Sequence, residues 1–326
     1  MKPTVRTMAK ELELSAATVS KALSGKAEIS EQTREKVISY AKEVGYFKNT
    51  SLRGRLGVLV ANPSDIEDSS ILFHMLMGFQ KYAEKLQNES VIINVNLDDM
   101  IKQTLDELII KSHLDGLFVA GLKTTDPYYK QLETTVNPLV VMDILCHNPM
   151  VGTVGTDSIA GGNMAIGHLQ SLGHRRIGFI NGYKEAYISQ ERFAGYVAAL
   201  DHYNMPFSPE LCYSGDFSRE SGCKAAEYFL DKKITAIYAA SDIMALGALQ
   251  HFASVGLSLP QDMSLVGFDG QPICLGSTPP LTTIAQNPTA LGEAACTLLR
   301  LLPEASPIKH VRMEPTLVVR SSTCKI

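Results

Sequence analysis

Two short amphipathic patterns joined by a tight turn open the chain. Between residues 7 and 23, apolar side chains recur at helical spacing and can share one buried face: Met8, Ala9, Leu12, Val19, Ala22 and Leu23. Ser15 precedes the second pattern and is its predicted N-cap, because its hydroxyl can accept a hydrogen bond from an N–H of the next turn. Ala16, Ala17, Ser20 and Lys21 then face outward. This arrangement predicts a helix-turn-helix, whose second helix enters the DNA major groove.

A third amphipathic helix is predicted between residues 30 and 44. Ser30 is its predicted N-cap, and its apolar side chains are Val37, Tyr40, Ala41 and Val44. Gly25 and Gly45 are the predicted ends of the second and third helices. Three helices in fewer than fifty residues predict a small bundle, assigned to residues 1–48, and the polar, basic stretch 49–56 is a predicted linker.

From residue 57 the pattern alternates short apolar runs with longer helical stretches. The predicted strands are 57–61, 91–95, 116–119, 139–142, 177–180, 236–239 and 264–268. The predicted helices lie near 72–87, 100–112, 158–172, 190–203, 219–231, 242–255 and 289–302. Continuous apolar strands alternating with helices predict parallel sheets covered on both faces. Because the units are too many for one sheet, we expect two lobes.

Polar side chains follow several of these strands: Asn62, Ser64, Asp143, Ser241, Asp242 and Asp269. Ligands of parallel sheets bind at the carboxyl ends of the strands, where these side chains converge. Arg192 and Phe217 lie at the starts of helical regions. Carboxylates, an arginine and an aromatic ring together suit a polyol ligand. Each residue alone is explained as well by a helix cap or a core position, so the prediction depends on their joint placement.

Composition narrows the class of protein. The 326 residues predict two or three domains, and no apolar run or N-terminal apolar segment indicates a membrane or secreted protein. Six scattered cysteines predict reduced thiols and no metal site. Residues 1–56 carry 11 Lys and Arg against six Asp and Glu, whereas the remainder is acidic. A basic head suits phosphate contact, although charge alone does not distinguish this from a solvated surface.

Motifs along nearly the whole chain resemble the LacI/GalR family of bacterial transcription regulators. They are ATVSKAL at 17–23, SEQTREKV at 30–37, Gly45-Tyr46, VVMD at 140–143, LGHRRIGFI at 172–180, RFAGY at 192–196, SDIMALGA at 241–248, VGFD at 266–269 and PLTTI at 280–284. The resemblance implies a helix-turn-helix domain and a periplasmic-binding-protein-like α/β core of doubly wound parallel sheets. The core is expected at 57–326, with one lobe of about 57–156 and 286–314 and another of about 157–285 and 315–326.

The resemblance also assigns site residues. Ala16, Ala17 and Lys21 match base-reading positions, and Thr18, Ser20 and Thr33 match positions near phosphates. Thr4, Ser15 and Leu52 complete the expected DNA-binding set. Effector-contacting positions match Asp143, Arg192, Phe217, Ser241 and Asp269. The full expected effector-binding set is Asn62, Ser64, Leu72, Asp143, Arg192, Phe217, Ser241, Asp242 and Asp269.

The chain departs from the family pattern at several positions. Glu13 stands where many members have Gly, which disfavours a left-handed conformation in the turn. Ala16 and Ala17 can offer only methyl contacts to thymine, so Lys21 carries most of the polar readout. The linker is short, and Leu52 matches the wedge leucine of the family's hinge. Ser241 replaces an Asn of many sugar-responsive members, and Ala186 replaces an Arg of purine-responsive ones.

We therefore predict a transcriptional repressor acting as a homodimer on operator DNA, whose affinity changes when a sugar or derivative binds between the lobes. A phosphorylated sugar is also open as the effector. The alternative is a transport-type solute-binding protein without a DNA role, which leaves the basic head unexplained. No enzyme, cofactor or membrane contact is expected, and His168 and His174 are wrongly spaced for a shared metal. We expect a cytoplasmic protein that is nucleoid-associated on DNA, and without a C-terminal heptad tail no tetramer.

Overall fold

The computed structural model describes residues 4–23, 29–44, 54–63, 70–304 and 307–326. The chain divides into two compact units, unit 1 with residues 1–66, 74–154 and 289–311, and unit 2 with residues 67–73, 155–288 and 312–326. Gly25, Gly45, Leu52 and Ser64, together with most of the predicted linker, lie outside the described residues. Among the helices that are described, none has the length and apolar character needed to cross a membrane.

The head consists of α1 (Val5–Glu11), α2 (Ala16–Leu23) and α3 (Glu31–Glu43). The six apolar side chains predicted to share a face are all buried, together with Val37 and Ala41 of α3. The backbone N–H of Thr18 donates to Oγ of Ser15 at 2.9 Å, and that of Thr33 donates to Oγ of Ser30 at 3.3 Å. Both predicted N-caps are therefore confirmed.

The turn between α1 and α2 differs from expectation at Glu13. Its φ is +55°, in the left-handed region that the sequence reading considered disfavoured for a residue with a side chain. The N–H of Leu14 donates to the carbonyl of Ala9 at 2.9 Å, which closes the end of α1. This hydrogen bond gives a partner to a carbonyl at the end of α1, and its contribution offsets the modest steric cost of the left-handed conformation at Glu13. The turn therefore forms without glycine.

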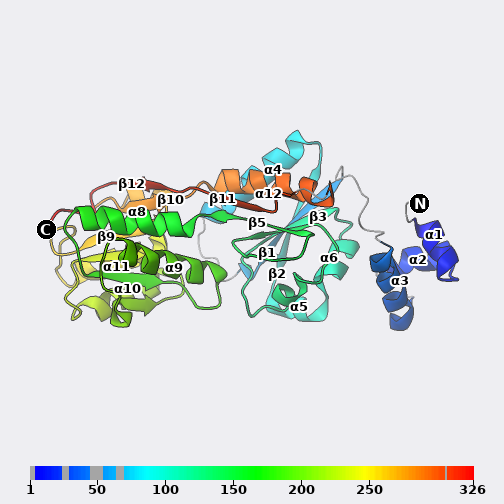
Figure 1. Cartoon of the computed structure of the whole chain (residues 1–326), viewed down its shortest axis with the longest axis horizontal. Coiled ribbons are helices and arrows are strands. Elements are labelled where there is room, and N and C mark those ends of the chain that lie inside the picture. The colour runs from blue at the N-terminus through cyan, green and yellow to red at the C-terminus, as the bar shows by residue number, and fades with distance from the viewer. Residues whose placement is uncertain (1–3, 24–28, 45–53, 64–69, 305–306) are drawn as a thin grey trace. The chain divides into compact units, whose positions relative to one another are not determined.

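Unit 1 contains a sheet in the order β11-β5-β4-β3-β1-β2. Its strands are β1 (Arg55–Ala61), β2 (Glu89–Val95), β3 (Gly116–Ala120), β4 (Leu139–Met142), β5 (Val151–Thr156) and β11 (His310–Met313). Its helices are α4 (Ser70–Lys85), α5 (Leu97–Lys102), α6 (Leu105–Lys111), α7 (Pro127–Gln131) and α12 (Pro288–Leu301), followed by a short 3-10 turn at Leu302–Glu304. β1 pairs in parallel with both β2 and β3, and β4 pairs in parallel with β3 and β5. Figure 1 shows α4 and α12 beside each other on this unit.

Unit 2 contains a second sheet in the order β12-β10-β9-β8-β6-β7. Its strands are β6 (Ile177–Asn181), β7 (Cys212–Ser214), β8 (Ala236–Ala239), β9 (Ser264–Asp269), β10 (Thr282–Ala285) and β12 (Thr316–Val318). β12 runs antiparallel to β10, and the pairs β6–β7, β6–β8, β8–β9 and β9–β10 are parallel. The helices are α8 (Ser158–Ser171), α9 (Tyr187–His202), α10 (Arg219–Phe229) and α11 (Asp242–Ser254), with 3-10 turns at Pro209–Leu211 and Pro272–Leu275.

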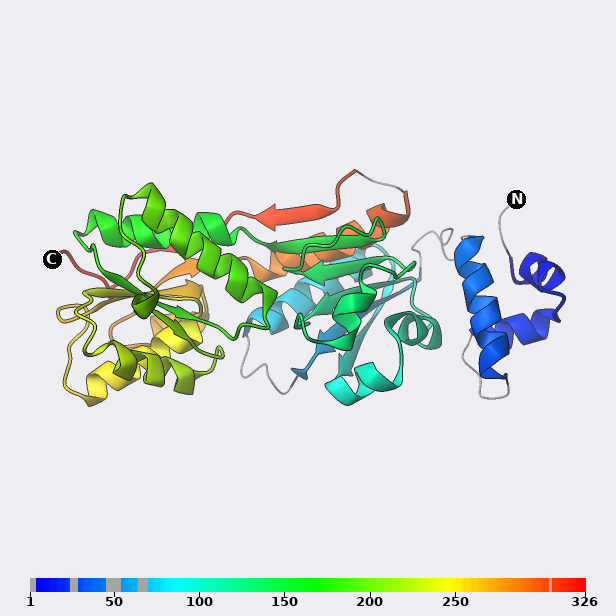
Figure 2. The ribbon, with the colours of Figure 1, turned by 60° about the horizontal axis from the view of Figure 1, so that its bottom comes forward.

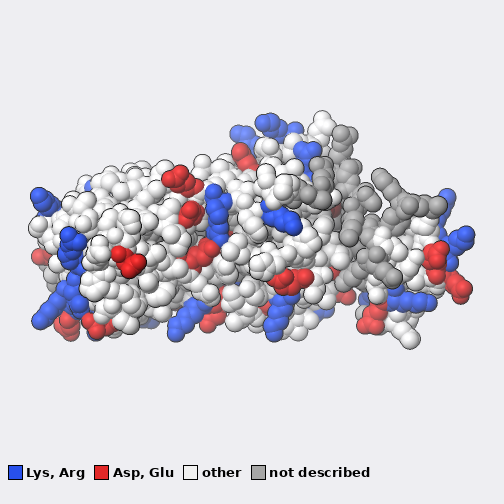
Figure 3. Space-filling model, in the orientation of Figure 1, with Lys and Arg blue, Asp and Glu red and all other residues white. Residues whose placement is uncertain are grey.

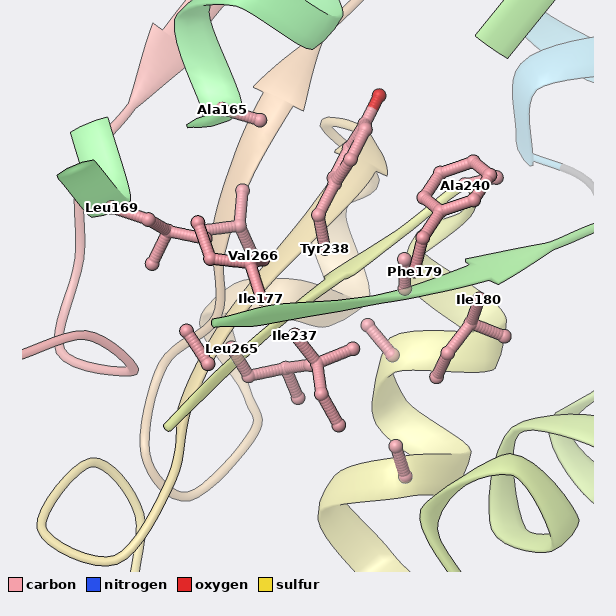
Figure 4. Packing of buried hydrophobic residues seen from close by; sticks show 14 of the residues in the cluster. Ala165, Leu169, Ile177, Phe179, Ile180, Ile237, Tyr238, Ala240, Leu265 and Val266 are labelled. Atoms are coloured by element: carbon pink, nitrogen blue, oxygen red, sulfur yellow. The ribbon is translucent and has the colours of Figure 1, made fainter. Parts of the chain in front are cut away.

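Helices cover both faces of the unit 2 sheet. α8 packs on α9 and α10 packs on α11, and the two pairs lie on opposite sides of the strands (Figures 1 and 2). Figure 4 shows Tyr238 and Val266 directed toward Ala165 of α8, whereas Ile237 and Leu265 point to the other side. All five of these side chains are fully buried. Because both faces are covered, successive residues of a strand are apolar, which is why these strands are readable from sequence.

The predicted parallel α/β architecture is confirmed, and each of the seven predicted strands is present. The single helix predicted near 100–112 is wrong, because Gln103 is extended and Thr104 caps a new helix, giving α5 and α6. The sequence reading also missed β5, β7, β10, β11, β12 and α7. The missed strands are three to six residues long, and β5 contains two glycines, so neither length nor apolar character marks them.

Candidate functional site

The head presents the start of α2 outward. Ala16, Ala17 and Ser20 are exposed, Lys21 is half-buried, and the opposite face of α2 is buried through Val19 and Leu23. Thr4 caps α1, since the N–H of Thr7 donates to Oγ1 of Thr4 at 3.1 Å. At the α1 end of the head, Lys and Arg side chains lie beside Asp and Glu side chains, and both charges are also interspersed over the visible face of the core (Figure 3). The head can therefore offer a helix end with small side chains and one cation to DNA.

Three further head residues of the expected DNA-binding set lie at helix starts: Ser15, Thr18 and Thr33. The hydroxyls of Ser15 and Thr18 are 2.8 Å apart at the start of α2, and those of Ser30 and Thr33 are 2.8 Å apart at the start of α3. Thr18 and Thr33 are half-buried, so each can both support its helix end and reach a phosphate.

In unit 2, Arg192 of α9 meets the carboxyl edge of the sheet. Its Nη2 donates to Oδ1 of Asp269 at 3.2 Å, and its Nη1 donates to the carbonyl oxygen of Ala240, which follows β8. The guanidinium carbon lies 4.0 Å from the ring centroid of Phe268, so the ring covers one face of the cation. Arg192 and Asp269 are only 6% and 7% exposed. The charge of the arginine is thus matched inside the protein.

Asp269 ends β9 with a φ of +123° and is held by a second side chain. Nε2 of Gln286, just beyond β10, donates to Oδ1 of Asp269 at 2.7 Å. Burial raises the pKa of the Asp269 carboxyl, and the positive charge of Arg192 and the hydrogen bond from Gln286 oppose that shift. These contacts fix the carboxylate at the sheet edge, where it can accept a hydrogen bond from a ligand hydroxyl.

Asp242 lies beneath this pair. It is fully buried, its Oδ1 accepts from the Thr283 hydroxyl at 2.6 Å, and its Oδ2 accepts from the backbone N–H of Gln271 at 2.7 Å. Burial, together with the negative charge of Asp269, raises the pKa of Asp242 to about 7. The positive charge of Arg192 opposes the rise at Asp269, whereas Asp242 is held by the hydrogen bonds from Thr283 and Gln271. Asp242 therefore supports the loop after β9.

Ser241 and Phe217 lie at the same carboxyl edge. Oγ of Ser241 accepts from the N–H of Met244 at 3.2 Å and caps α11. Phe217 follows β7 with a φ of +69°, and its ring meets Tyr183 edge to face at 5.2 Å between centroids. A side chain at Gly182 would collide with the Phe217 ring, so this glycine permits the ring's position. The expected residues of unit 2 are thus gathered at one sheet edge.

Of the remaining expected residues, Asn62 and Asp143 follow strands at the carboxyl edge of the unit 1 sheet, and Leu72 lies in α4. Nδ2 of Asn62, after β1, donates to Oδ2 of the buried Asp126 at 3.0 Å. Asp143, after β4, has a φ of +63°, and its N–H donates to the carbonyl of Val154 at 2.8 Å. Leu72 is half-buried in α4.

Several residues at these edges were not found from sequence. Phe268 and Gln286 complete the surroundings of Arg192 and Asp269, and Asp126 anchors Asn62. Gln286 follows a strand that the pattern did not reveal, and Asp126 is an N-cap before Pro127. An X-Pro step at a helix start was the available signal for Asp126.

His168 and His174 have structural partners. His174 is buried between the Thr235 hydroxyl at 2.9 Å and the carbonyl of Cys324 at 3.1 Å, and burial lowers its pKa. His168 pairs with the Thr323 hydroxyl at 2.9 Å. All six cysteines are free thiols, as predicted. Within the described ranges, no group of three or more His, Cys, Asp or Glu could hold a metal ion.

Comparisons with known proteins match the whole chain. Residues 4–49 match the model of "Bacterial regulatory proteins, lacI family", and residues 166–323 match a periplasmic binding protein-like domain. The HTH-type transcriptional repressor CytR of Escherichia coli (strain K12) is 32% identical over 98% of this chain and 96% of its own. The ribose operon repressor of Haemophilus influenzae is 30% identical over 98% of each chain.

Solved structures give the same result. A transcriptional regulator CelR–cellobiose complex has a TM-score of 0.74 at 27% identity and covers 98% of this chain and 99% of its own. The lac repressor dimer bound to operator and the anti-inducer ONPF shares the fold, with a TM-score of 0.72 at 24% identity, 99% coverage of this chain and 100% of its own. Because the relatives are repressors along their full length, including the head, the chain belongs to the lacI family of bacterial regulatory proteins and is a DNA-binding transcriptional regulator, not an enzyme.

Proposed function

We propose that the chain represses transcription by reading operator DNA through α2, and that a neutral polyol bound at the carboxyl edge of unit 2 controls its affinity. The transport-type alternative is not favoured, because the full-length relatives are repressors that share the head. The observation that carries the effector assignment is the buried pair of Arg192 and Asp269.

The charge balance of this pair favours a neutral ligand. The positive charge of Arg192 is matched by Asp269, and a second carboxyl, Asp242, lies beside them. A ligand phosphate or carboxylate would find no unpaired cation among these groups. It would instead lie near the carboxyls of Asp269 and Asp242 in a region of low dielectric constant, where repulsion between like charges is strong. Hydroxyl groups instead pair with carboxylates and carbonyls at little electrostatic cost, and the Phe217 ring can cover an apolar sugar face.

The proposed effector contacts of unit 2 are Arg192, Phe217, Ser241 and Asp269, with Asp242 as their support. Asn62, Ser64, Leu72 and Asp143 stay predictions. Similar proteins of known structure support the class of ligand: one regulator at 27% identity is a cellobiose complex, and another at 26% identity, from Enterococcus faecium, has bound ribose.

A thermal-shift series on the full chain tests the effector class. D-ribose and cellobiose are compared with ribose 5-phosphate and glucose 6-phosphate, each up to 10 mM. A neutral sugar at 100 times its Kd adds about 2.7 kcal/mol of stability, which raises the Tm of a unit of this size by several degrees. Asp269→Asn should abolish that shift. Stabilisation by the phosphates alone would contradict the neutral-ligand assignment.

For DNA reading, we propose that Lys21 contacts guanine and that Ala16 and Ala17 contact thymine methyl groups. Thr4, Ser15, Thr18, Ser20 and Thr33 are proposed backbone contacts, and Leu52 a minor-groove contact. Salt-dependent gel shifts on selected operator fragments measure this binding.

We also propose that the chain works as a homodimer in the cytoplasm, at the nucleoid when it is bound to DNA. One helix-turn-helix reads only a few base pairs, whereas two copies read a near-palindromic site. α4 leaves Phe73 and Met77 exposed at 59% and 47%, a spacing of one helical turn that suits burial against another surface. Analytical ultracentrifugation of the full chain tests the dimer.

A further inference from the structure

The chain passes between its two units three times after residue 74. The passages lie at residues 154–155, 288–289 and 311–312. Each passage places one polar residue of unit 2 close to the crossing point. Thr156 follows the first passage, Gln286 precedes the second, and Arg312 is the first residue after the third. These three segments are covalent connections between the two units.

These three residues bond to one another and to the effector site. Oγ1 of Thr156 donates to Oε1 of Gln286 at 2.6 Å, and Nε2 of Gln286 donates to Asp269 at 2.7 Å. In the other direction, Nη1 of Arg312 lies 3.4 Å from the carbonyl oxygen of Thr156. Thr156 is thus bonded to both other passages.

A bidentate ion pair closes the network on α9. Arg312 donates through Nη1 to Oε2 of Glu191 at 2.7 Å and through Nη2 to Oε1 of the same carboxylate. Glu191 is the residue before Arg192 in α9. The same helical turn therefore carries the partner of Arg312, at the third passage, and the arginine of the effector site. The two side chains are 25% and 20% exposed, which limits solvent screening of the pair.

We infer that Glu191 and Arg312 are positioning residues that couple the effector site to the segments joining the two units. The path runs from Asp269 through Gln286, Thr156, Arg312 and Glu191 to Arg192 and back to Asp269, and we name these six residues the crossing ring. A ligand that displaces Arg192 or Asp269 therefore also displaces Gln286, Thr156 and Arg312, which lie at the three passages. The ring therefore provides a continuous chain of bonds between the effector site and the segments that join the units.

The backbone beside the ring gives a direct readout. The N–H of Asp157 donates to the carbonyl of Met313 at 2.8 Å, which joins the first passage to the third. The exchange rate of this amide reports how often the two segments separate. Peptides that contain Asp157 and peptides that contain Met313 can be followed by hydrogen-exchange mass spectrometry of the full chain.

The test is a double-mutant cycle on that exchange, without any ligand. Asp269→Asn perturbs the effector-site end of the ring, and Arg312→Met removes the ion pair. We expect Asp269→Asn to accelerate exchange at Asp157 by at least about 5-fold in the wild-type background and by less than about 2-fold beside Arg312→Met. Arg176→Met is the matched control, because Arg176 pairs with Glu210 at an exposed site of the same unit. In the Arg176→Met background, Asp269→Asn should still accelerate exchange at Asp157 by about 5-fold.

A charge reversal separates positioning from general stability. Glu191→Arg combined with Arg312→Glu restores an ion pair of opposite sense, and we expect it to recover most of the Asp269→Asn effect. If Asp269→Asn fails to give a cooperative melt, Arg192→Lys takes its place. The inference would be overturned if Asp269→Asn accelerated exchange at Asp157 equally in the Arg312→Met and wild-type backgrounds. It would also be overturned if Asp269→Asn left that exchange unchanged in the wild-type background. It rests on the proposed effector site, but the cycle contains no sugar, so failure of every sugar to bind would refute the effector class separately.

Discussion

Removing the arginine of the effector site should cost stability in a pH-dependent manner. Arg192→Met deletes the ion pair with Asp269, the hydrogen bond to the Ala240 carbonyl and the cation over the Phe268 ring, while a similar volume stays filled. Breaking a buried ion pair by removing one partner costs about 3–5 kcal/mol, because the other charge stays buried without compensation. In a unit of this size the Tm should fall by roughly 6–20 °C.

The pH dependence follows from Asp269. Burial already raises its pKa, and without Arg192 nothing of opposite charge resists that rise. A carboxyl whose folded pKa lies above its unfolded value binds a proton on folding, so its contribution to stability is retained at low pH and is lost as the pH rises through the folded pKa. The loss relative to wild type should therefore be smaller at pH 5 than at pH 8.

Differential scanning calorimetry of the full chain at pH 5, 6, 7 and 8 measures this. Arg176→Met is the control, because it breaks an exposed pair with side chains 44% and 55% accessible that solvent screens, so its Tm should change little. A loss for Arg192→Met that equals that of the control, or one that does not change with pH, would refute the idea of an uncompensated Asp269.

Four further predictions concern other parts of the chain. Lys21→Ala should weaken specific operator binding by about 1–3 kcal/mol in a titrated gel shift, and an equal loss on random DNA would show that Lys21 only contacts phosphate. Ser15→Ala removes the α2 N-cap and should cost about 0.5–2 kcal/mol, seen as a lower melting temperature of the head by circular dichroism, with Ser20→Ala as an exposed control. Asp242 should make the wild-type core less stable as the pH rises from about 4 toward 7, and Asp242→Asn should flatten that dependence in urea melts. Gly222→Ala should lower the Tm, because the new methyl would collide with the carbonyl of Met244 where α10 crosses α11; an unchanged Tm would mean the helices separate at no cost.

The sequence predicted the interior strands β1, β3, β4, β6, β8 and β9, because burial on two faces makes them continuously apolar, but it did not predict the interior strands β5 and β10. β8 and β9 are read directly from Ala236–Ala239 and Ser264–Asp269 for this reason. β10 and β12 are short and carry Thr at several positions, so their strand character depends on pairing with neighbours that are distant in sequence. Such pairing has no local signature.

At the candidate site, the sequence predicted which residues gather at the sheet edge but not how each is used. Arg192 and Asp269 were both expected, yet their pairing depends on the approach of α9 to β9, 77 residues apart in sequence. Asp242 looked equivalent to Asp269 because both follow strands. Only the structure shows that the Asp242 carboxylate accepts hydrogen bonds from Thr283 and from the backbone N–H of Gln271. These bonds form only when the loop after β9 packs against Asp242, and the sequence pattern does not reveal that packing.

The way the chain passes back and forth between its units has a consequence for synthesis on the ribosome. The head is contiguous from residue 4 to residue 44, so it can fold soon after it emerges. Unit 1 needs residues 289–311, and unit 2 needs residues 312–326, including the buried Ser322, whose hydroxyl bonds Leu265 and Thr282. Neither unit is complete until these late segments have been synthesised. A nascent chain therefore carries a head that can fold well before the two units that hold the candidate effector residues are complete.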